Sequence, residues 1–600
     1  MKQTVVHLLT VLIVALIILL PSIVMNSPIE GTTNGKMFFF LFLILIGTFF
    51  LCFKIIISPT INIHFSNIDF ILFIWISYIL FNAEFHHVPI SGRLLELYGL
   101  IALYIILRQF EPSRFRILLG AMIIGATIQA IYGNLQLWGY CPSYHALFSM
   151  TGSFFNPGPF AGYLSCVFPV ALGFYLFKPI KSVTVMSIIG FSLIVILMVL
   201  VASRSLAAWL ALSTSSIILL SVRYHLFQWL KRGLVVKHKI VLLWLVCITI
   251  GIGGILGIFQ MKTGSSNGRL LIWKITSGMI AEHPVTGVGI DRFKAYYMDK
   301  QGAYFKEKPD SPEVMLAGDT NYCFNELLQH TVENGIIGLI LMLTTGICVF
   351  CTQSSSFYEL SWIAKAGVMG IIVFAMFSYP AHVLPIKINL VCYLAFISTL
   401  SKQKTDRVPI KKYVFVKYST ILFLSGSLII GFSYLSTYYK AYKNWNRAYL
   451  LYKIKNYTGS LEIYESVWTP LKYNGNYLTH YGKALNIAGK QEQSIVILQQ
   501  AVKYYPNTVA YTTLGDNYKV LEKFAEAEQF YLKASYMNPS RFYPKYLLAK
   551  LYDETGQTEK AIMIAQELLN KTVKIESTAI DEIKDEMRNI LQKKNKIHRL

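Results

Sequence analysis

The sequence predicts an all-α protein, in which a polytopic membrane bundle of about 12–13 spans precedes a soluble α-solenoid of helical repeats. Of the 600 residues, 54% are hydrophobic and 14% are charged, which is too apolar for a soluble globule of this size. Apolar runs of about 16 to 22 residues alternate with short polar loops, as in membrane helices. After Tyr438 the composition changes to that of soluble helices and begins to repeat.

Each predicted span is an apolar run that contains almost no charge. The first run is interpreted as an uncleaved helix, because it is long and lacks a small-x-small cleavage site before Asn26. The predicted spans are 5–25, 37–57, 68–83, 94–108, 117–138, 159–177, 182–202, 205–221, 239–260, 334–352, 363–380, 384–400 and 418–437.

The distribution of Lys and Arg predicts the orientation, since short loops rich in these residues stay in the cytoplasm. They gather in the loops 108–116, 222–239 and 401–412, which fall on one side of the predicted bundle. The N-terminus is then cytoplasmic. The polar loop 261–334 and the C-terminal tail face the opposite compartment together.

The net charge of +23 does not indicate nucleic-acid binding, because the cytoplasmic loops account for much of it and no nucleic-acid motif accompanies it. The 8 cysteines are scattered, with no CxxC pair. They predict neither a zinc site nor a disulfide framework. No metal and no cofactor is expected.

The tail repeats at a period of about 33 to 34 residues, which indicates stacked helix-turn-helix units. Small residues at Gly482, Gly515 and Ala549 allow paired helices to approach closely. One unit shows the tetratricopeptide spacing in Tyr511, Leu514, Gly515, Tyr518, Ala527, Tyr531, Ala534 and Pro539. The predicted repeat domain, 438–600, is interpreted as a docking module for a protein partner. The alternative is a stabilising cap over the membrane domain.

Two arginines stand at outward ends of predicted spans. Arg204 lies in VASRSLAAWL, and Arg269 lies in SNGRLLIWK at the start of the long loop. Arginine near hydrocarbon is costly without an anionic partner. Its planar fork matches phosphate oxygens, so the pair suits a diphosphate, although each arginine alone could be an interfacial anchor or a carboxylate partner.

The strings SRSLAAWL, GRLLIW, HPVTGVGI and ENGIIGLI, with GSFFNPGPFAGYL before them, resemble the O-antigen ligase family in order and spacing. The resemblance covers roughly residues 150–390 of a membrane domain that spans 1–437. It implies a metal-independent glycosyltransferase in the bacterial inner membrane, with the loop 261–334 and the repeats in the periplasm. Arg204 and Arg269 would bind the diphosphate of an undecaprenyl-diphosphate-linked glycan donor.

The family includes ligases that act on lipid A-core in lipopolysaccharide biosynthesis, glycan polymerases, and transferases for protein O-glycosylation. A ligase is the leading interpretation here, with the protein O-oligosaccharyltransferase and the O-antigen polymerase as alternatives. The expected partners are the lipid-linked donor, a lipid A-core or protein acceptor, and a protein bound to the repeats.

One position departs from the family pattern. Where many members have His-Asn, this chain has Phe324 followed by Asn325, and phenylalanine cannot accept a proton. Glu326, adjacent to Asn325, is a candidate base, although it could instead cap the helix that follows. His330 follows one helical turn later and is either catalytic or a packed helix residue. Asp319 and His382 are further candidates, and an inactive protein or catalysis by positioning alone remain as alternatives.

Two other classes of protein are considered. A transporter of glycan lipids would also have many spans, but it usually places ionisable groups near the midplane of the membrane. The predicted spans contain few such groups beyond Glu96, Lys365 and Lys387. A non-catalytic scaffold built on the repeats is the third class.

Overall fold

The computed structural model describes residues 2–25, 27–57, 60–63, 65–225, 263–401, 406–409 and 414–597. These residues form two compact units, and each is described here by itself. The first unit comprises 1–85, 92–261 and 324–440, and the second comprises 86–91, 262–323 and 441–600. The long polar loop therefore belongs to the same unit as the C-terminal tail.

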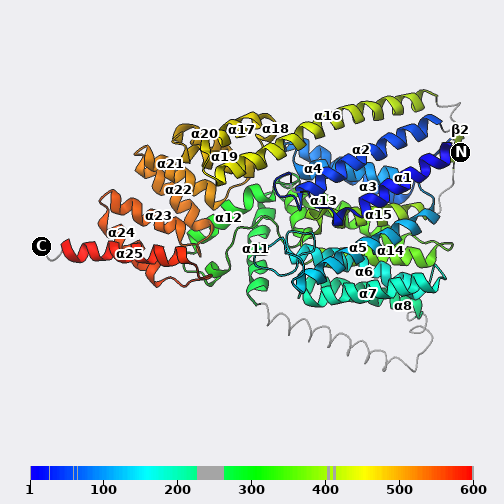
Figure 1. Cartoon of the computed structure of the whole chain (residues 1–600), viewed down its shortest axis with the longest axis horizontal. Helices are drawn as coiled ribbons and strands as arrows, with labels where there is room; N and C mark the ends of the chain where they lie inside the picture. Colours follow the sequence, from blue (N-terminus) through cyan, green and yellow to red (C-terminus); the bar gives the residue numbers. More distant parts are fainter. Residues whose placement is uncertain are drawn as a thin grey trace, which may run out of the picture. The chain divides into compact units, whose positions relative to one another are not determined.

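The first unit is a bundle of long apolar helices (Figure 1). Short 3-10 turns η1 (Leu20–Ser22), η2 (Pro112–Arg114) and η4 (Pro380–His382) begin at or beside prolines, which fix φ but donate no hydrogen bond. The helices are α1 (Lys2–Ile18), α2 (Asn34–Ile57), α3 (Asn67–Phe85), α4 (Gly92–Leu107), α5 (Phe115–Leu137), α6 (Pro157–Phe177), α7 (Val183–Ala202), α8 (Leu206–Arg223), α13 (Glu326–Cys351), α14 (Tyr358–Ala375), α15 (Leu384–Thr399) and the first part of α16 (Val414–Lys453).

Helix α6 is largely buried and packs against α5, α7, α8, α14 and α15. It begins where Asn156 accepts a hydrogen bond from the Gly158 backbone N–H at 2.9 Å, with Pro157 as its first residue. Phe160 and Tyr163 are fully buried on it. An apolar helix that is buried on all sides forms the core of a membrane bundle.

Nine helices among the described residues are long and apolar enough to cross a membrane, and Leu8–Ile18 and Leu384–Thr399 are shorter apolar helices. The prediction of an all-helical polytopic bundle is thereby confirmed. The predicted span 239–260 lies outside the described residues. Two short strands, β1 (Thr60–Ile63) and β2 (Asp406–Pro409), pair antiparallel between the helices.

The second unit contains the helical repeats (Figure 1). Adjacent antiparallel helices pack in pairs, and each pair packs on the next, as in a solenoid. Together with the last part of α16 they are α17 (Tyr457–Ser466), α18 (Trp468–Leu471), α19 (Gly475–Ile487), α20 (Gln491–Tyr504), α21 (Thr508–Val520), α22 (Phe524–Met537), α23 (Tyr543–Glu554), α24 (Thr558–Asn570) and α25 (Thr578–Ile597).

The long loop folds as helices that pack on these repeats. It forms α11 (Thr263–Glu282), α12 (Phe293–Glu307) and the 3-10 turn η3 (Pro312–Leu316). Helix α12 packs against α20 and α22, and α11 packs against α12 and η3. The loop is therefore an ordered part of the second unit.

Candidate functional site

The closing motif of the long loop begins helix α13. Asn325 is its N-cap, and the Asn325 side-chain oxygen accepts a hydrogen bond from the Leu328 backbone N–H at 3.2 Å. Glu326 is thus the first helical residue, where the partial positive charge of the helix end favours a carboxylate. The cap is Asn325, so Glu326 is available for another role.

The Glu326 carboxylate turns toward the segment before α15. Its Oε1 accepts a hydrogen bond from the backbone N–H of Ala381 at 2.9 Å, and the residue is only 8% exposed. Arg93 and Lys387 attract its negative charge, whereas Glu333 repels it. A buried carboxylate with a single hydrogen bond, to a backbone N–H, is a candidate to accept a proton.

Four polar residues surround this carboxylate, and with it they form what we call the α13 cluster: Arg93, Glu326, Gln329, Glu333 and His382. The guanidinium of Arg93 is 2.8 Å from the Glu333 carboxylate, whose side chain is 1% exposed. Gln329 Nε2 lies 2.7 Å from His382 Nε2. Because an amide nitrogen only donates, His382 accepts this bond through an unprotonated Nε2.

A second ion pair lies beside the cluster and joins Lys387 to Glu96. Both residues lie within predicted spans, where charges are rare. Paired charges of this kind are expensive to separate inside a protein, so the pair joins α4 to α15 firmly.

His330 lies one turn after Glu326 on α13 and is held by packing. Trp75 Nε1 on α3 donates to His330 Nε2 at 3.2 Å, and the two rings meet edge to face at 5.5 Å. The Asn334 side chain lies 3.3 Å from the other ring nitrogen. Both ring nitrogens therefore face packed side chains, which favours the structural role that the sequence left open for this residue.

Phe324 occupies the position where the family pattern has histidine. Its φ is +56°, a left-handed conformation that bulky residues rarely adopt, and its ring meets the Tyr379 ring edge to face at 5.1 Å. Strained residues of this kind persist only where their surroundings hold them. The turn that presents Asn325 and Glu326 is therefore kept even though the imidazole is absent.

Arg204 lies in the tight turn between α7 and α8, and its side chain is exposed. Its φ is +49°. Ser203 on one side bonds the Leu200 carbonyl at 2.7 Å, and Trp209 on the other side donates to the same carbonyl at 2.7 Å. The turn is thus fixed by its neighbours and presents the guanidinium at the end of two apolar helices.

Arg269 lies on α11 and belongs to the second unit, whereas Arg204, Asn325, Glu326 and His330 belong to the first. Helix α11 buries Leu271, Ile275 and Met279. Five residues after Arg269, Lys274 contacts Tyr304 on α12 at 2.8 Å and Glu313 on η3 at 3.2 Å. The Tyr304 hydroxyl and Lys274 lower the pKa of Glu313, so its charge fixes α11 to its neighbours.

Asp319, another candidate base, also lies in the second unit. Its carboxylate forms an ion pair with Arg541, which lies between α22 and α23. The carboxylate is therefore already occupied by a guanidinium of the tail. This contact favours a structural role for Asp319.

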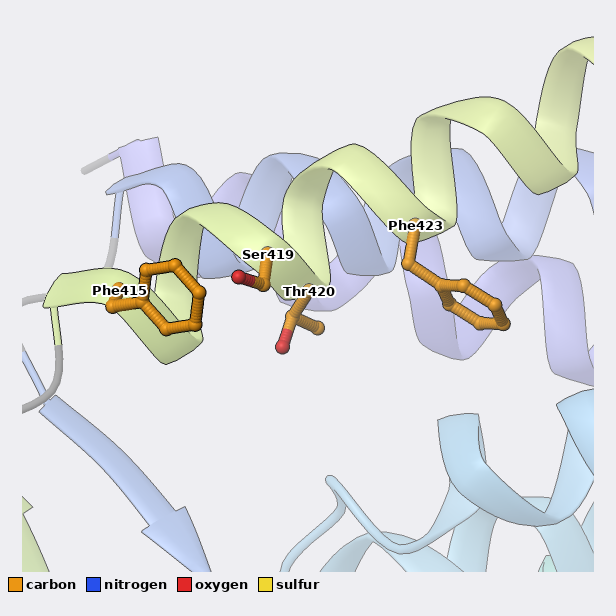
Figure 2. A pocket seen from close by; sticks show the side chains of 4 residues that line it. All are labelled: Phe415, Ser419, Thr420 and Phe423. Carbon is orange, nitrogen blue, oxygen red and sulfur yellow. The ribbon is translucent and has the colours of Figure 1, made fainter.

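A shallow hollow on the surface of α16 is lined by Phe415, Ser419, Thr420 and Phe423, whose side chains follow one side of the helix in Figure 2. None of the four is ionisable, and both phenylalanines are more than two-thirds exposed. Such a surface suits contact with lipid chains rather than chemistry on a glycan.

Reasoning from the sequence missed Arg93, Glu333 and Gln329. Arg93 lies at the start of an apolar run, a costly position that is a signal for a buried partner. Glu333 and Gln329 lie within the ENGIIG and LLQ motifs, where spacing alone could not show which way their side chains point.

The arrangement defines a polytopic membrane protein with a buried polar cluster at the end of its helices and a helical-repeat tail. Comparison with protein families then assigns it more narrowly. Residues 191–343 match the O-antigen ligase family, and 509–541 and 545–571 match tetratricopeptide repeats. These matches agree with the resemblance that the motifs predicted, to the O-antigen ligase family and to tetratricopeptide repeats. A search of curated proteins found no match.

Proposed function

We propose that the protein transfers a glycan from undecaprenyl diphosphate to an acceptor hydroxyl at the outer face of the bacterial inner membrane. The match of 191–343 to the O-antigen ligase family carries this proposal, since that segment contains both Arg204 and Arg269 and ends within α13. It supports a membrane glycosyltransferase of the ligase or polymerase type. The α13 cluster supplies a candidate base.

In the proposed step, the acceptor oxygen bonds to the anomeric carbon of the glycan. The bond from that carbon to the phosphate oxygen breaks, and its electron pair leaves with undecaprenyl diphosphate. The hydroxyl proton passes to the Glu326 carboxylate. Arg204 and Arg269 stabilise the negative charge that develops on the leaving diphosphate, so this step needs no metal ion.

The arginine roles are tested by Arg204→Ala and Arg269→Ala, assayed as glycan transfer from a purified lipid-linked donor. We expect each to lower the rate by about 10²- to 10³-fold, as loss of a transition-state charge contact does. Arg→Lys at either position should recover only part of the rate, since an ammonium lacks the planar fork. Arg223→Ala is the matched control, because Arg223 is an exposed arginine at the opposite end of α8 from Arg204.

The acceptor that we favour is lipid A-core, which makes the protein an O-antigen ligase. Deletion of the gene should then remove long-chain lipopolysaccharide and leave glycoproteins unchanged. Loss of glycoproteins alone would assign the protein O-oligosaccharyltransferase. An acceptor that carries a single repeat unit would assign the polymerase.

A transporter of lipid-linked glycans is the alternative from another class. The ion pairs Arg93–Glu333 and Lys387–Glu96 are among the largely buried charges that a transporter could use. Purified protein that moves a lipid-linked glycan across vesicles but transfers nothing would favour the transporter. Arginine variants with full function would favour a non-catalytic scaffold.

A further inference from the structure

We propose that the repeat tail is a clamp that positions the Arg269 helix for glycan transfer, and that Gln301, Asp299 and Lys533 are positioning residues. This inference rests on the proposed role of Arg269. The contacts that carry it lie wholly within the second unit and run from the tail through α12 to α11.

Gln301 is the central joint between the loop and the tail. It is fully buried on α12, and its side-chain nitrogen donates to the Met537 carbonyl at 2.6 Å and to the Gly318 carbonyl at 3.1 Å. Its side-chain oxygen accepts from the Tyr297 hydroxyl at 3.0 Å. One amide therefore holds the end of α22, the end of the loop and α12 itself.

The surroundings of Gln301 allow a close approach. At Gly302 an added Cβ would lie 3.4 Å from Met537 Cγ and 3.6 Å from its backbone nitrogen, so α12 and the end of α22 are in direct contact. Phe293, Tyr297, Met298 and Phe305 are all buried on α12. The surroundings of Gln301 are as buried as a protein core, where unpaired polar groups are costly.

Ionic contacts surround this apolar joint. Asp299 of α12 lies 3.2 Å from Lys533 of α22, and the Tyr511 hydroxyl of α21 donates to the same carboxylate at 3.1 Å. Lys574 donates to the Ala317 carbonyl at 3.0 Å. These polar contacts fix the orientation of α12 on the repeats, while the buried side chains around Gln301 set its distance from them.

Helix α12 in turn holds α11. Lys274 of α11 contacts Tyr304 of α12, and Trp273 donates to the Cys323 carbonyl at 3.0 Å. The position of α11, which carries Arg269, is therefore set by a chain of contacts that ends in the tail. Small displacements of a group that binds a transition state cost about 10²-fold in rate.

The primary test is Gln301→Leu in the full-length protein, which keeps the volume but removes both donated bonds. We expect hydrogen exchange of the α11 and α12 amides to rise and glycan transfer to fall about tenfold or more. Lys519→Ala is the control, because it removes an ion pair, with Glu554, that lies entirely within the tail. It should change neither measurement.

A charge exchange separates positioning from loss of folding. Asp299→Lys should lower transfer, and the added change Lys533→Asp should restore it by rebuilding the pair in reverse. Unchanged exchange in Gln301→Leu, raised exchange with full transfer, or no restoration by the double variant would each overturn the clamp. If Arg269→Ala leaves transfer unchanged, the proposed function fails, while the exchange measurement still reports on the clamp.

Discussion

At the scale of single residues, Glu326 is where sequence and geometry agree best on a chemical role. The adjacent Asn325 caps the helix, His330 is packed between Trp75 and Asn334, and Asp319 is bound by Arg541. Among the candidates for the missing histidine, the structure leaves Glu326 with a single hydrogen bond to a backbone N–H and no direct cation partner within the contacts that it shows. Since His382 also holds a hydrogen bond, to Gln329, Glu326 is the base that we propose.

Glu326→Gln tests this assignment, since the amide preserves shape but cannot take up a proton. We expect transfer to fall by about 10²- to 10⁴-fold, the usual contribution of a general base. The assay is single-turnover glycan transfer from a purified lipid-linked donor. Glu84→Gln, an exposed carboxylate on α3, is the control. A Glu326→Gln enzyme with full activity would leave positioning alone as the source of catalysis.

Some residues of the α13 cluster could not be predicted from motifs, because their partners are distant in the sequence. Arg93 and Glu333 are 240 positions apart, and their pairing depends on how α4 and α13 pack. Arg204 and Arg269 were predicted because they stand at the outward ends of predicted spans, where arginine close to hydrocarbon is costly. Arg93 also begins an apolar run, but the sequence could not show that Glu333 is its partner.

At the scale of helices, hydropathy predicted the spans well because burial in lipid imposes one simple rule on composition. Hydropathy did not predict where α13 begins. The helix starts at Glu326, directly after the Asn325 cap and eight residues before the predicted span 334–352. Gly335 then interrupts α13 with φ +64° and ψ −170°, a conformation open only to glycine. The first two turns of α13, which carry the polar cluster, are thereby set apart from its apolar remainder.

The packing of α12 on the repeats was also beyond the sequence. The repeat spacing predicted the tail correctly, because each unit repeats the same local contacts. The repeat spacing does not show which other segment will pack on the surface of the repeat helices. The tail was interpreted as a docking module for a partner, and the structure shows a segment of the same chain packed on α20 and α22.

The junction between α16 and the repeats contains a titratable group. His480 of α19 stacks on Tyr449 of α16 at 4.8 Å and accepts a hydrogen bond from Trp445 at 3.3 Å. Burial, aided by Lys483, lowers the pKa of His480 to about 4. The folded state therefore holds this imidazole neutral at pH values where the unfolded chain begins to protonate it.

The lowered pKa of His480 makes the folded protein less stable as the pH falls. Because the folded pKa is lowered from 6.5, this contribution to stability is complete above pH 6.5 and is lost as pH falls toward 4. At pH 5 the loss is about 2 kcal/mol. Thermal unfolding of the full-length protein in detergent should show a smaller decrease between pH 7 and pH 5 for His480→Phe, which keeps the stacking but cannot protonate. Exposed His87→Phe serves as control, and equal decreases in all three proteins would contradict the assignment.

At the scale of the whole molecule, the packing of α12 on the repeats constrains the topology. Segments that pack together must lie in the same compartment. Between the loop 263–323 and the repeats lie the apolar helices α13, α14, α15 and α16, and if each of the four crosses the membrane, the chain returns to the side on which it began. The distribution of Lys and Arg independently predicts that the loop and the tail face outward together, which agrees with an even number of crossings.

Single cysteines test the predicted orientation directly. We expect Lys306→Cys in the loop and Glu576→Cys in the tail to react with a membrane-impermeant maleimide in spheroplasts, because both positions are exposed and are predicted to be periplasmic. Glu111→Cys, exposed in the basic 108–116 loop, should react only after lysis. Cys141→Ser removes a partly exposed thiol from the background. Different reactivity of Lys306→Cys and Glu576→Cys would contradict the packing of loop on tail, whereas reaction of Glu111→Cys before lysis would contradict only the predicted orientation.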